Sequence, residues 1–350
     1  MLKDWLLLCL CPAFTPVQAR RLVQGGLNSG SLADRLRVLP ADELAQARRQ
    51  LPALLRWLEG EDCHALPLYA ADYPALLATL ADPPPILYLQ GKPDLLHLPL
   101  IAIVGTRKPS AEGRRIAREF AAALVRAGYG IVSGLALGID AESHAGALGA
   151  EGLTLAVLGS GLERLYPKAN RGLARQVREQ GVLISEFPPW ASPRDWHFPL
   201  RNRIISGLAH GVLVVEAAQR SGSLITAHLA AAQGREVFAI PGSIRNPQSR
   251  GCHALLRNGV KLVENVADIL EELPALLAWE QSRLEPPLLL APQEATVLAA
   301  LGYGPTSLET LAAETGYPAP TLLGLLAALE LQGLAAASPL GWSRVGEVPT

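Results

Sequence analysis

The sequence has few cysteines and no long hydrophobic run. Its four cysteines form no CxxC pair of the kind that binds zinc, and they are too sparse for a disulfide scaffold. No apolar run approaches the roughly 20 residues of a membrane-spanning helix. The apolar stretch WLLLCL near the start is short, follows Asp4 and lacks a cleavage-site pattern. We therefore expect a helix there, no membrane partner, and a reduced, cytoplasmic setting.

Familiar nucleotide-binding and catalytic motifs are also missing. The loop VGTRKPS is not GxGxxG, and Lys108 is followed by Pro109 instead of Ser or Thr, which excludes a Walker loop. The serines of GSG and SGS are not in a nucleophile elbow. Asp140, Glu142 and His144 do not share one helix face, so a structural histidine near a helix start is favoured over a metal site. We expect no enzyme activity, no metal and no cofactor.

Charge is small overall but unevenly distributed. The chain has 31 Lys and Arg against 32 Asp and Glu, a formal net charge of -1. Residues 100–260 contain 19 Lys and Arg against 11 Asp and Glu, whereas residues 261–350 contain 3 against 11. A polyanion is therefore expected to bind the basic middle of the chain.

A repeated strand and helix pattern fills this middle part. Short apolar runs alternate with stretches of helical spacing, as in the unit Ile101–His144, where strand, helix and strand follow one another. The expected strands are Ile101–Val104, Tyr129–Val132, Thr154–Leu158, Val182–Ile184, Gly211–Val215 and Glu236–Ile240. Strands joined by helical crossovers predict an α/β fold with a doubly wound, mostly parallel sheet.

Short helices are expected before this pattern. They are Trp5–Cys11, Pro16–Gly25 and Asp42–Leu58. Asp42 is the predicted N-cap of the last one. The segment Glu61–Pro99 is proline-rich, and proline removes a backbone donor and disfavours helix in the residue before it. We expect a linker there that ends in an edge strand, Ile86–Leu89.

The tail has the pattern of a winged helix. An acidic, then proline-rich hinge is expected from Leu262 to about Leu290. The expected helices are Pro292–Leu301, one opened by a capping box at Thr306–Glu309, and Ala319–Gln332, followed by the turn-rich ASPLGWSRV. From residue 288 on, one cation, Arg344, stands against five carboxylates, which disfavours duplex DNA binding. We expect a protein-contact or regulatory module, and domains at 1–62, 63–275, 289–350 with a linker at 276–288.

Cations and small residues recur where the predicted strands end. The exits of parallel strands meet at one sheet edge, where backbone N–H groups and arginines can bind phosphate. The cations expected at this edge are Arg107, Lys168, Arg171, Arg201, Arg203, Arg220 and Arg245. Tyr166, Phe187, Trp190 and Trp196 lie among them and could stack on bases, whereas Phe198 before Pro199 is expected in the core. The pattern favours a polyanion groove.

Several of these motifs resemble one family. VGTRKPS, VSGLALGIDAESHAGAL, AVLGSGLERLYPKAN, ISEFPP and FPLRNRIISGLAHGVLVVEAAQRSGSLITAHLAAAQGREVFAIPGS are similar to the DNA-processing protein A family, also called DprA or Smf, from about Ala70 to Leu270. YPALLATLADPPPILYLQG resembles the family's entry segment. The N-terminal helices resemble its variable SAM-like or helix-hairpin-helix domain, with FTPV where a glycine-containing hairpin is expected. The tail is similar to the winged-helix domain of some members.

The resemblance implies a non-catalytic homodimer with an extended Rossmann-like domain. Such a protein binds and protects incoming single-stranded DNA and helps load the RecA recombinase during natural transformation. Family DNA contacts carry over to Arg107 and Lys168. The candidate DNA-binding residues are Gly105, Thr106, Arg107, Ser133, Gly134, Lys168, Asn170, Arg171, Arg201, Asn202, Arg203, Arg220, Ser221 and Ser223. The candidate dimer contacts are His253, Leu255, Leu256 and Val260.

Two alternatives stay open at this point. One is a nucleotide-processing enzyme, like the phosphoribohydrolases, whose core is similar. It would need a PGGxGT-type loop with a catalytic carboxylate, and PGSIRNP stands in the comparable place. The other is a sensor of small nucleotides.

Overall fold

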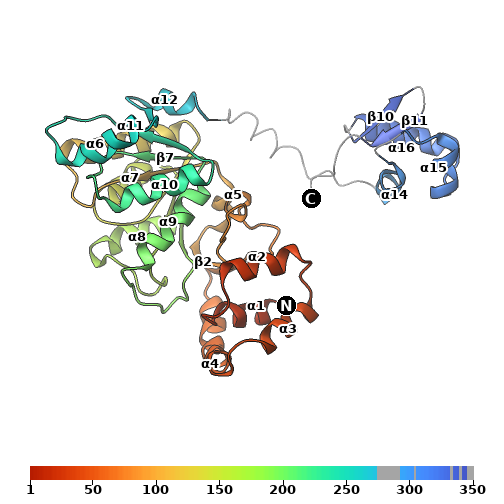
Figure 1. Cartoon of the computed structure of the whole chain (residues 1–350), viewed down its shortest axis with the longest axis horizontal. Coiled ribbons are helices and arrows are strands. Elements are labelled where there is room, and N and C mark those ends of the chain that lie inside the picture. The colour runs from red at the N-terminus through yellow and green to blue at the C-terminus, as the bar shows by residue number, and fades with distance from the viewer. Residues whose placement is uncertain (274–291, 303–304, 332–333, 339–340, 345–350) are drawn as a thin grey trace. The chain divides into compact units, whose positions relative to one another are not determined.

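The computed structural model describes residues 1–273, 292–302, 305–331, 334–338 and 341–344. The chain divides into two compact units, Met1–Pro274 and Ala275–Thr350 (Figure 1). The predicted linker 276–288 and most of the predicted hinge lie outside the described residues. The hinge prediction is wrong for residues 262–273, because they belong to the first unit and Val263 and Ile269 are fully buried.

Residues 1–273 contain one mixed sheet, in the order β1-β2-β6-β5-β4-β3-β7-β8-β9. The strands are β1 (Cys63–Pro67), β2 (Ile86–Gly91), β3 (Leu100–Val104), β4 (Gly130–Ser133), β5 (Thr154–Val157), β6 (Val182–Ser185), β7 (Gly211–Val214), β8 (Glu236–Ala239) and β9 (Lys261–Leu262). β3 to β9 pair in parallel, and β2 pairs antiparallel with both β1 and β6. The doubly wound, mostly parallel α/β sheet is thus confirmed.

The segment before β3 differs from its prediction. β2 is not an edge strand, because β1 pairs along its outer side and is itself the edge. Pro83, Pro84 and Pro85 all precede β2, so every residue of the strand keeps its backbone donor. The proline-rich stretch that suggested a linker therefore delivers the chain into an interior strand.

Helices cover both faces of the sheet. They are α5 (Ala75–Ala78), α6 (Ala111–Arg126), α7 (Ile139–Gly149), α8 (Arg171–Gln180), α9 (His197–Leu208), α10 (Gly222–Ala232), α11 (Arg250–Arg257) and α12 (Val266–Leu270), with 3₁₀ turns η1 (Pro93–His97), η2 (Lys168–Asn170) and η3 (Pro247–Ser249). Right-handed crossovers put α6, α7 and α8 on one face and α9 and α10 on the other. α7 contacts both α6 and α8, and α9 contacts α10 (Figure 1).

Four helices precede the sheet: α1 (Leu2–Cys9), α2 (Pro16–Gln24), α3 (Ser29–Arg37) and α4 (Ala41–Leu58). Trp5 is fully buried and its indole N–H donates to the carbonyl of Pro85 at 2.9 Å, so the helices share a core with the sheet. The N-cap prediction is wrong, because Pro40 holds that position and Asp42 lies in the first turn. α3 was not predicted; its start is marked only by a polar capping box between Asn28 and Ser31.

Described residues of the second unit form a winged helix. α14 (Pro292–Ala300), α15 (Leu308–Thr315) and α16 (Ala319–Leu331) precede an antiparallel pair, β10 (Ala335–Ser338) and β11 (Gly341–Arg344). Leu311, Leu322 and Leu326 are fully buried in its own core. The capping prediction is shifted by one residue: Ser307 caps α15 by accepting from the N–H of Thr310 at 3.2 Å.

Candidate nucleic-acid interface

A cavity of about 430 Å³ opens where the winding of the sheet reverses. From β3 the chain continues to β4 on one side, whereas from β7 it continues to β8 on the other, although β3 and β7 are neighbours. Ligands of doubly wound sheets bind in the crevice outside the carboxyl ends of the strands at this switch point. The cavity is lined by the β3 exit, the start of α7, the N-terminal half of α9 and the start of α10. We call it the switch-point cavity.

Hydrogen bonds to Glu216 and close packing against Ile139 fix the β3 exit loop. The N–H of Thr106 donates to the carbonyl of Glu216 at 2.7 Å. The Glu216 carboxylate accepts from the backbone N–H and the hydroxyl of Ser110 at 2.9 and 2.6 Å. A side chain at Gly105 would lie 2.6 Å from Ile139. The loop therefore has a fixed course that turns Arg107 outward.

Arg107 is exposed at the mouth of the cavity. Its guanidinium lies 5.6 Å from the centre of the Phe198 ring, a cation–π arrangement. The Phe198 ring in turn lies 5.5 Å from that of Tyr166, and both rings line the cavity. No carboxylate of the described part of the chain forms an ion pair with Arg107. An exposed cation thus lies beside two aromatic rings.

Arg201 lies deeper in the same wall, with a side chain that is only 4% exposed. Its Nη1 donates to the carbonyl of Gly134 at 2.8 Å and to that of Val157. Burial lowers the pKa of Arg201 to about 10, so it stays charged at neutral pH. Burial also raises the pKa of Asp140, whose carboxylate accepts from the N–H of Gly134 at 3.2 Å, while the charge of Arg201 opposes that rise. Arg201 therefore joins two strand exits and adds positive charge beneath the cavity.

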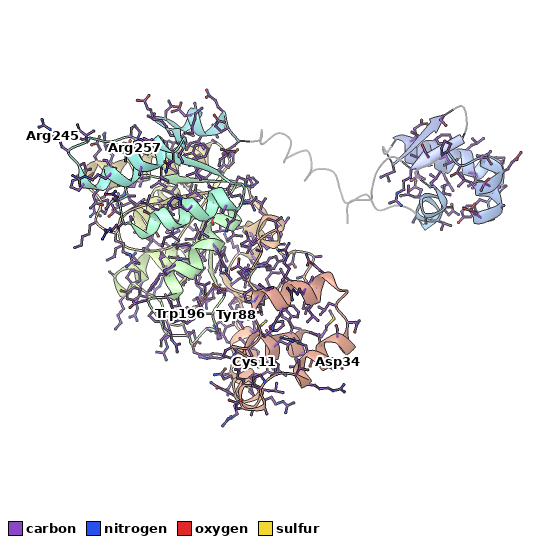
Figure 2. All side chains as sticks on the ribbon, in the orientation of Figure 1. Cys11, Asp34, Tyr88, Trp196, Arg245 and Arg257 are labelled. Carbon is purple, nitrogen blue, oxygen red and sulfur yellow. The ribbon has the colours of Figure 1, made fainter. Side chains whose placement is uncertain are left out.

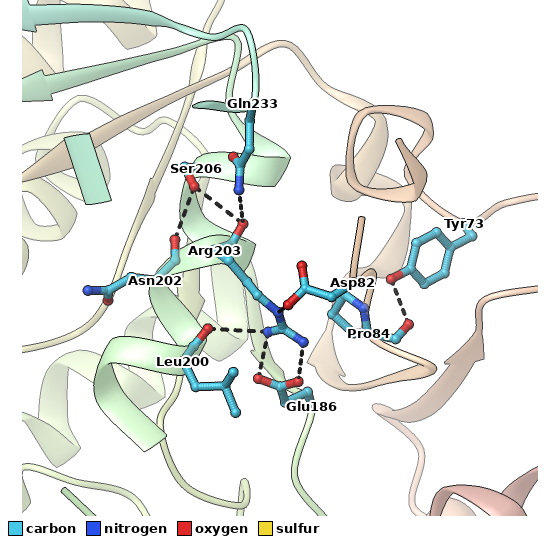
Figure 3. Close-up of polar contacts among 9 residues, drawn as sticks. All are labelled: Tyr73, Asp82, Pro84, Glu186, Leu200, Asn202, Arg203, Ser206 and Gln233. Carbon is cyan, nitrogen blue, oxygen red and sulfur yellow. Dashed lines mark hydrogen bonds and ion pairs between the residues drawn. The ribbon is translucent and has the colours of Figure 1, made fainter. Parts of the chain in front are cut away.

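Arg203 does not line the cavity, so the structure does not place it with Arg107 as predicted. Its guanidinium forms two bonds with Glu186, at 2.8 and 2.7 Å, and a third with Asp82 at 3.0 Å (Figure 3). Side chains two residues apart on a helix point about 200° apart, so Arg201 and Arg203 cannot share a face of α9. Burial raises the pKa of Glu186, and Arg203 opposes that rise. Arg203 is a structural cation.

The remaining candidates divide into three groups. Gly105, Asn202, Ser221 and Ser223 line the switch-point cavity, and Gly134 lines a small extension of it beside Arg107. Thr106, Ser133 and Asn170 support the strand exits: Ser133 donates to the carbonyl of Ile103 at 2.6 Å, and Asn170 to that of Leu135 at 2.9 Å. Lys168, Arg171 and Arg220 are exposed but lie outside the cavity lining.

Aromatic residues are distributed differently from expectation. Phe198 was expected in the core but forms part of the cavity wall. Trp196 is 56% exposed and packs edge-on against Phe187, whereas Trp190 packs partly buried against the core. Figure 2 shows Trp196 and Arg245 well apart on the same unit, so the predicted cations and aromatics do not all gather at one place.

Asp140 and Asp195 line the cavity and were missed by the sequence reasoning. Asp140 was interpreted as part of a capped helix start, and its place in GIDAESH after β4 was the available signal. His144 is buried, with Nδ1 at 2.7 Å from the Thr154 hydroxyl, but its buried Nε2 has no hydrogen-bond partner among the described residues, so the expected satisfied histidine is met at one ring nitrogen only. In the part of the chain that the structure describes, no three His, Cys, Asp or Glu side chains form a metal-binding group. No described helix is both long and apolar enough to cross a membrane.

One predicted dimer contact is buried within its own chain. Leu255 is 4% exposed and belongs to the core, so it is not available to a partner. Leu256 and Val260 pack against that core but are only partly buried, and His253 Nε2 lies 2.9 Å from the carbonyl of Gly242. These three stay predictions.

A doubly wound sheet with a cavity at its switch point, lined by Arg107 and Arg201 together with Asp140 and Asp195, defines an extended Rossmann-like class of ligand-binding protein. A family model described as DNA recombination-mediator protein A matches residues 64–274, and one described as the DprA winged helix domain matches residues 281–339. The chain therefore belongs to the DprA/Smf family.

Relatives agree with this assignment. Protein Smf of Escherichia coli is 42% identical over 309 residues, which cover 86% of this chain and 83% of that protein. The X-ray structure of DNA processing protein A from Streptococcus pneumoniae is 38% identical, with a TM-score of 0.60 over 73% of this chain and 87% of that one. A DNA processing protein A from Helicobacter pylori, described for its single-stranded DNA binding mode, is 28% identical, with a TM-score of 0.55 over 61% and 97% of the two chains.

Proposed function

We propose that this chain is a non-catalytic protein that binds single-stranded DNA in the switch-point cavity. The observation that carries the proposal is the exposed Arg107 beside Phe198 and Tyr166, above the buried charge of Arg201. Membership of the DprA/Smf family and the single-stranded DNA binding of the Helicobacter pylori relative support it.

The chemistry of the cavity matches a nucleic-acid backbone with unpaired bases. Arg107 supplies guanidinium donors for a phosphate, and Ser221 and Ser223 supply hydroxyl and backbone donors at the start of α10. The rings of Tyr166 and Phe198 offer surfaces on which bases can stack. In a duplex the bases are already stacked and paired, so these rings favour a single strand.

The cellular role follows from the family. We propose that the protein protects incoming DNA and helps load a RecA-type recombinase during natural transformation or homologous recombination, as a homodimer in the cytoplasm. His253, Leu256 and Val260 are the proposed dimer contacts. The winged helix is proposed as a protein-contact module, because Arg344 is the one cation among its described residues.

A second candidate is a nucleotide-sensing or nucleotide-processing role. The volume of about 430 Å³ that favours it lies within the range of small-ligand pockets. Mononucleotides that compete with DNA at micromolar concentration, or that lose their base on incubation with the protein, would support this role.

Anisotropy titrations of labelled single-stranded and double-stranded oligonucleotides of equal length, at several salt concentrations, test the proposal. We expect tighter binding of the single strand, with a slope of log affinity against log salt of about -0.7 for each neutralised phosphate. Equal affinity for both forms, or no single-strand binding at low salt, would refute it.

A further inference from the structure

A second groove, of about 370 Å³, lies along α8 and does not belong to the switch-point cavity. One side is formed by three arginines of α8, namely Arg171, Arg175 and Arg178. The lining also includes Gln90 of β2 and Glu163 of the loop before η2. We call it the α8 groove. α8 is the helix between β5 and β6, on the part of the sheet nearest β2 (Figure 1).

The arginines recur at helical spacing. Arg171, Arg175 and Arg178 are separated by four and three residues, which places them on one face of α8. With a rise of about 1.5 Å per residue, the stripe is about 10 Å long. Lys168, in the 3₁₀ turn just before α8, stands three residues ahead of Arg171 and extends the stripe.

Within the described part of the chain, two of the three arginines have no carboxylate partner. Arg178 is bound to Asp62, with Nε and Nη2 at 2.8 and 2.6 Å from its Oδ2. Among the residues that the structure describes, Arg171 and Arg175 form no ion pair, and both are exposed. Glu163 contributes one negative charge to the lining. The groove keeps a positive excess, which an anionic ligand would neutralise.

The floor of the groove is apolar. Leu162, Ala174 and Leu183 are buried there, and Leu165 is partly buried. A cationic rim over an apolar floor suits a chain with charged phosphates on one side and base surfaces on the other. Among the described residues no aromatic side chain lines this groove, so binding would depend on the backbone and tolerate any sequence.

One short segment connects the two depressions. Tyr166 lines the switch-point cavity, Tyr166 and Pro167 line its small extension, and Arg171 lines the α8 groove only four residues later. The exposed Lys168 stands in the sequence between the residues that line the two depressions. Small anions cannot span both sites, whereas a polyanionic strand can.

We propose that a single strand held in the switch-point cavity continues past Lys168 into the α8 groove, where Arg171 and Arg175 bind its phosphates. This inference rests on the proposed function and adds the direction in which the strand leaves the cavity. It assigns to α8 a second part of the DNA site.

The test is the variant Arg171→Gln/Arg175→Gln, titrated with oligonucleotides of about 5 and about 20 nucleotides. We expect roughly tenfold weaker binding of the long strand, about threefold for each lost phosphate contact, and a salt slope smaller in magnitude by about 1.4. Binding of the short strand should be unchanged. The matched control, Arg115→Gln/Arg126→Gln, removes the same charge from exposed positions of α6 that line neither site.

Three outcomes would overturn the proposal: unchanged long-strand binding, equal loss for both lengths, or equal loss in the α6 control. An Arg107→Glu variant measured in parallel separates this from the proposed function. If Arg107→Glu weakens both lengths and the α8 variant weakens neither, the switch-point cavity binds DNA and the α8 groove does not. If the α8 variant binds DNA as tightly as the parent protein but no longer binds an acidic protein that the parent binds, the groove would be assigned to that protein.

Discussion

Replacing Arg203 by methionine tests whether this residue supports the fold or contacts DNA. The side chains of Arg203 and Glu186 are 5% and 8% exposed, and they share a two-bond ion pair. Removing the cation leaves Glu186 buried without its charge partner, which costs about 3–5 kcal/mol in comparable buried pairs. The third bond joins Arg203 to the half-exposed Asp82, and its loss adds at most about 1 kcal/mol.

The loss of stability in Arg203→Met should come mainly from the ion pair between Arg203 and Glu186. Arg203→Met/Glu186→Leu removes both buried charges and should therefore be more stable than Arg203→Met alone, since apolar replacements of buried pairs are often neutral. Chemical unfolding of the three proteins, followed by circular dichroism, measures both differences.

Binding of single-stranded DNA by folded Arg203→Met is the second readout. We expect an affinity within about threefold of the parent protein at a matched salt concentration, because Arg203 faces Glu186 and Asp82 and not the cavity. Loss of affinity equal to that of an Arg107 variant, with no loss of stability, would contradict this reasoning.

Three further predictions concern single residues. Burial lowers the pKa of His144 to about 3, below its ordinary 6.5. The unfolded chain therefore binds more protons than the folded one, and the free energy of unfolding falls by about 1.4 kcal/mol per pH unit as the pH drops below about 6.5. His144→Gln should flatten this loss in unfolding curves measured between pH 6.5 and 4.5. Glu216→Gln removes a carboxylate that accepts two hydrogen bonds from Ser110 and should lower the free energy of unfolding by about 1–3 kcal/mol. The same preparation should bind single-stranded DNA more weakly. Unchanged stability would show that the Glu216 carboxylate does not hold the β3 exit loop in place. Gly138 has φ of 85° and no room for a side chain beside the carbonyl of Thr106, so Gly138→Ala should lower the thermal midpoint, and an unchanged midpoint would show that the turn can adapt.

The sheet was predictable because its strands are short apolar runs between helical stretches. A parallel strand is buried on both faces, so Ile101–Val104 and Gly211–Val215 are recognisable without knowledge of their partners. α3 and β1 were missed because they are only partly buried and their sequences, SGSLADRLR and CHALP, have no apolar face of clear period.

The site was predictable in position but not in the role of each residue. Strand exits mark the edge where ligands bind, and this argument led to Arg107 and the serines of α10. α9 is buried on nearly all sides, so its sequence has no polar face that would distinguish Arg201 from Arg203. The carboxylates that bind Arg203 come from distant segments, since Asp82 is 121 residues away. Only the tertiary structure brings these groups together.

Arg171 illustrates a different limit. Its position just past a strand exit assigned it to the main cavity, but the turn η2 carries the chain away before α8 begins. The arginine then lies over the flank of the sheet. Sequence spacing shows that Arg171 and Arg175 share a helix face, but not which neighbour forms the opposite wall of their groove.

The most direct test of the account is single-strand binding by Arg107→Glu, measured by anisotropy at a fixed salt concentration beside Arg115→Glu on α6. Charge reversal at the cavity mouth should weaken binding by at least roughly tenfold while the thermal midpoint stays unchanged, because Arg107 is exposed and has no ion-pair partner within the described part of the chain. The control should change affinity by less than about threefold. Equal affinity of Arg107→Glu and the parent protein would contradict the assignment of the switch-point cavity as the DNA site.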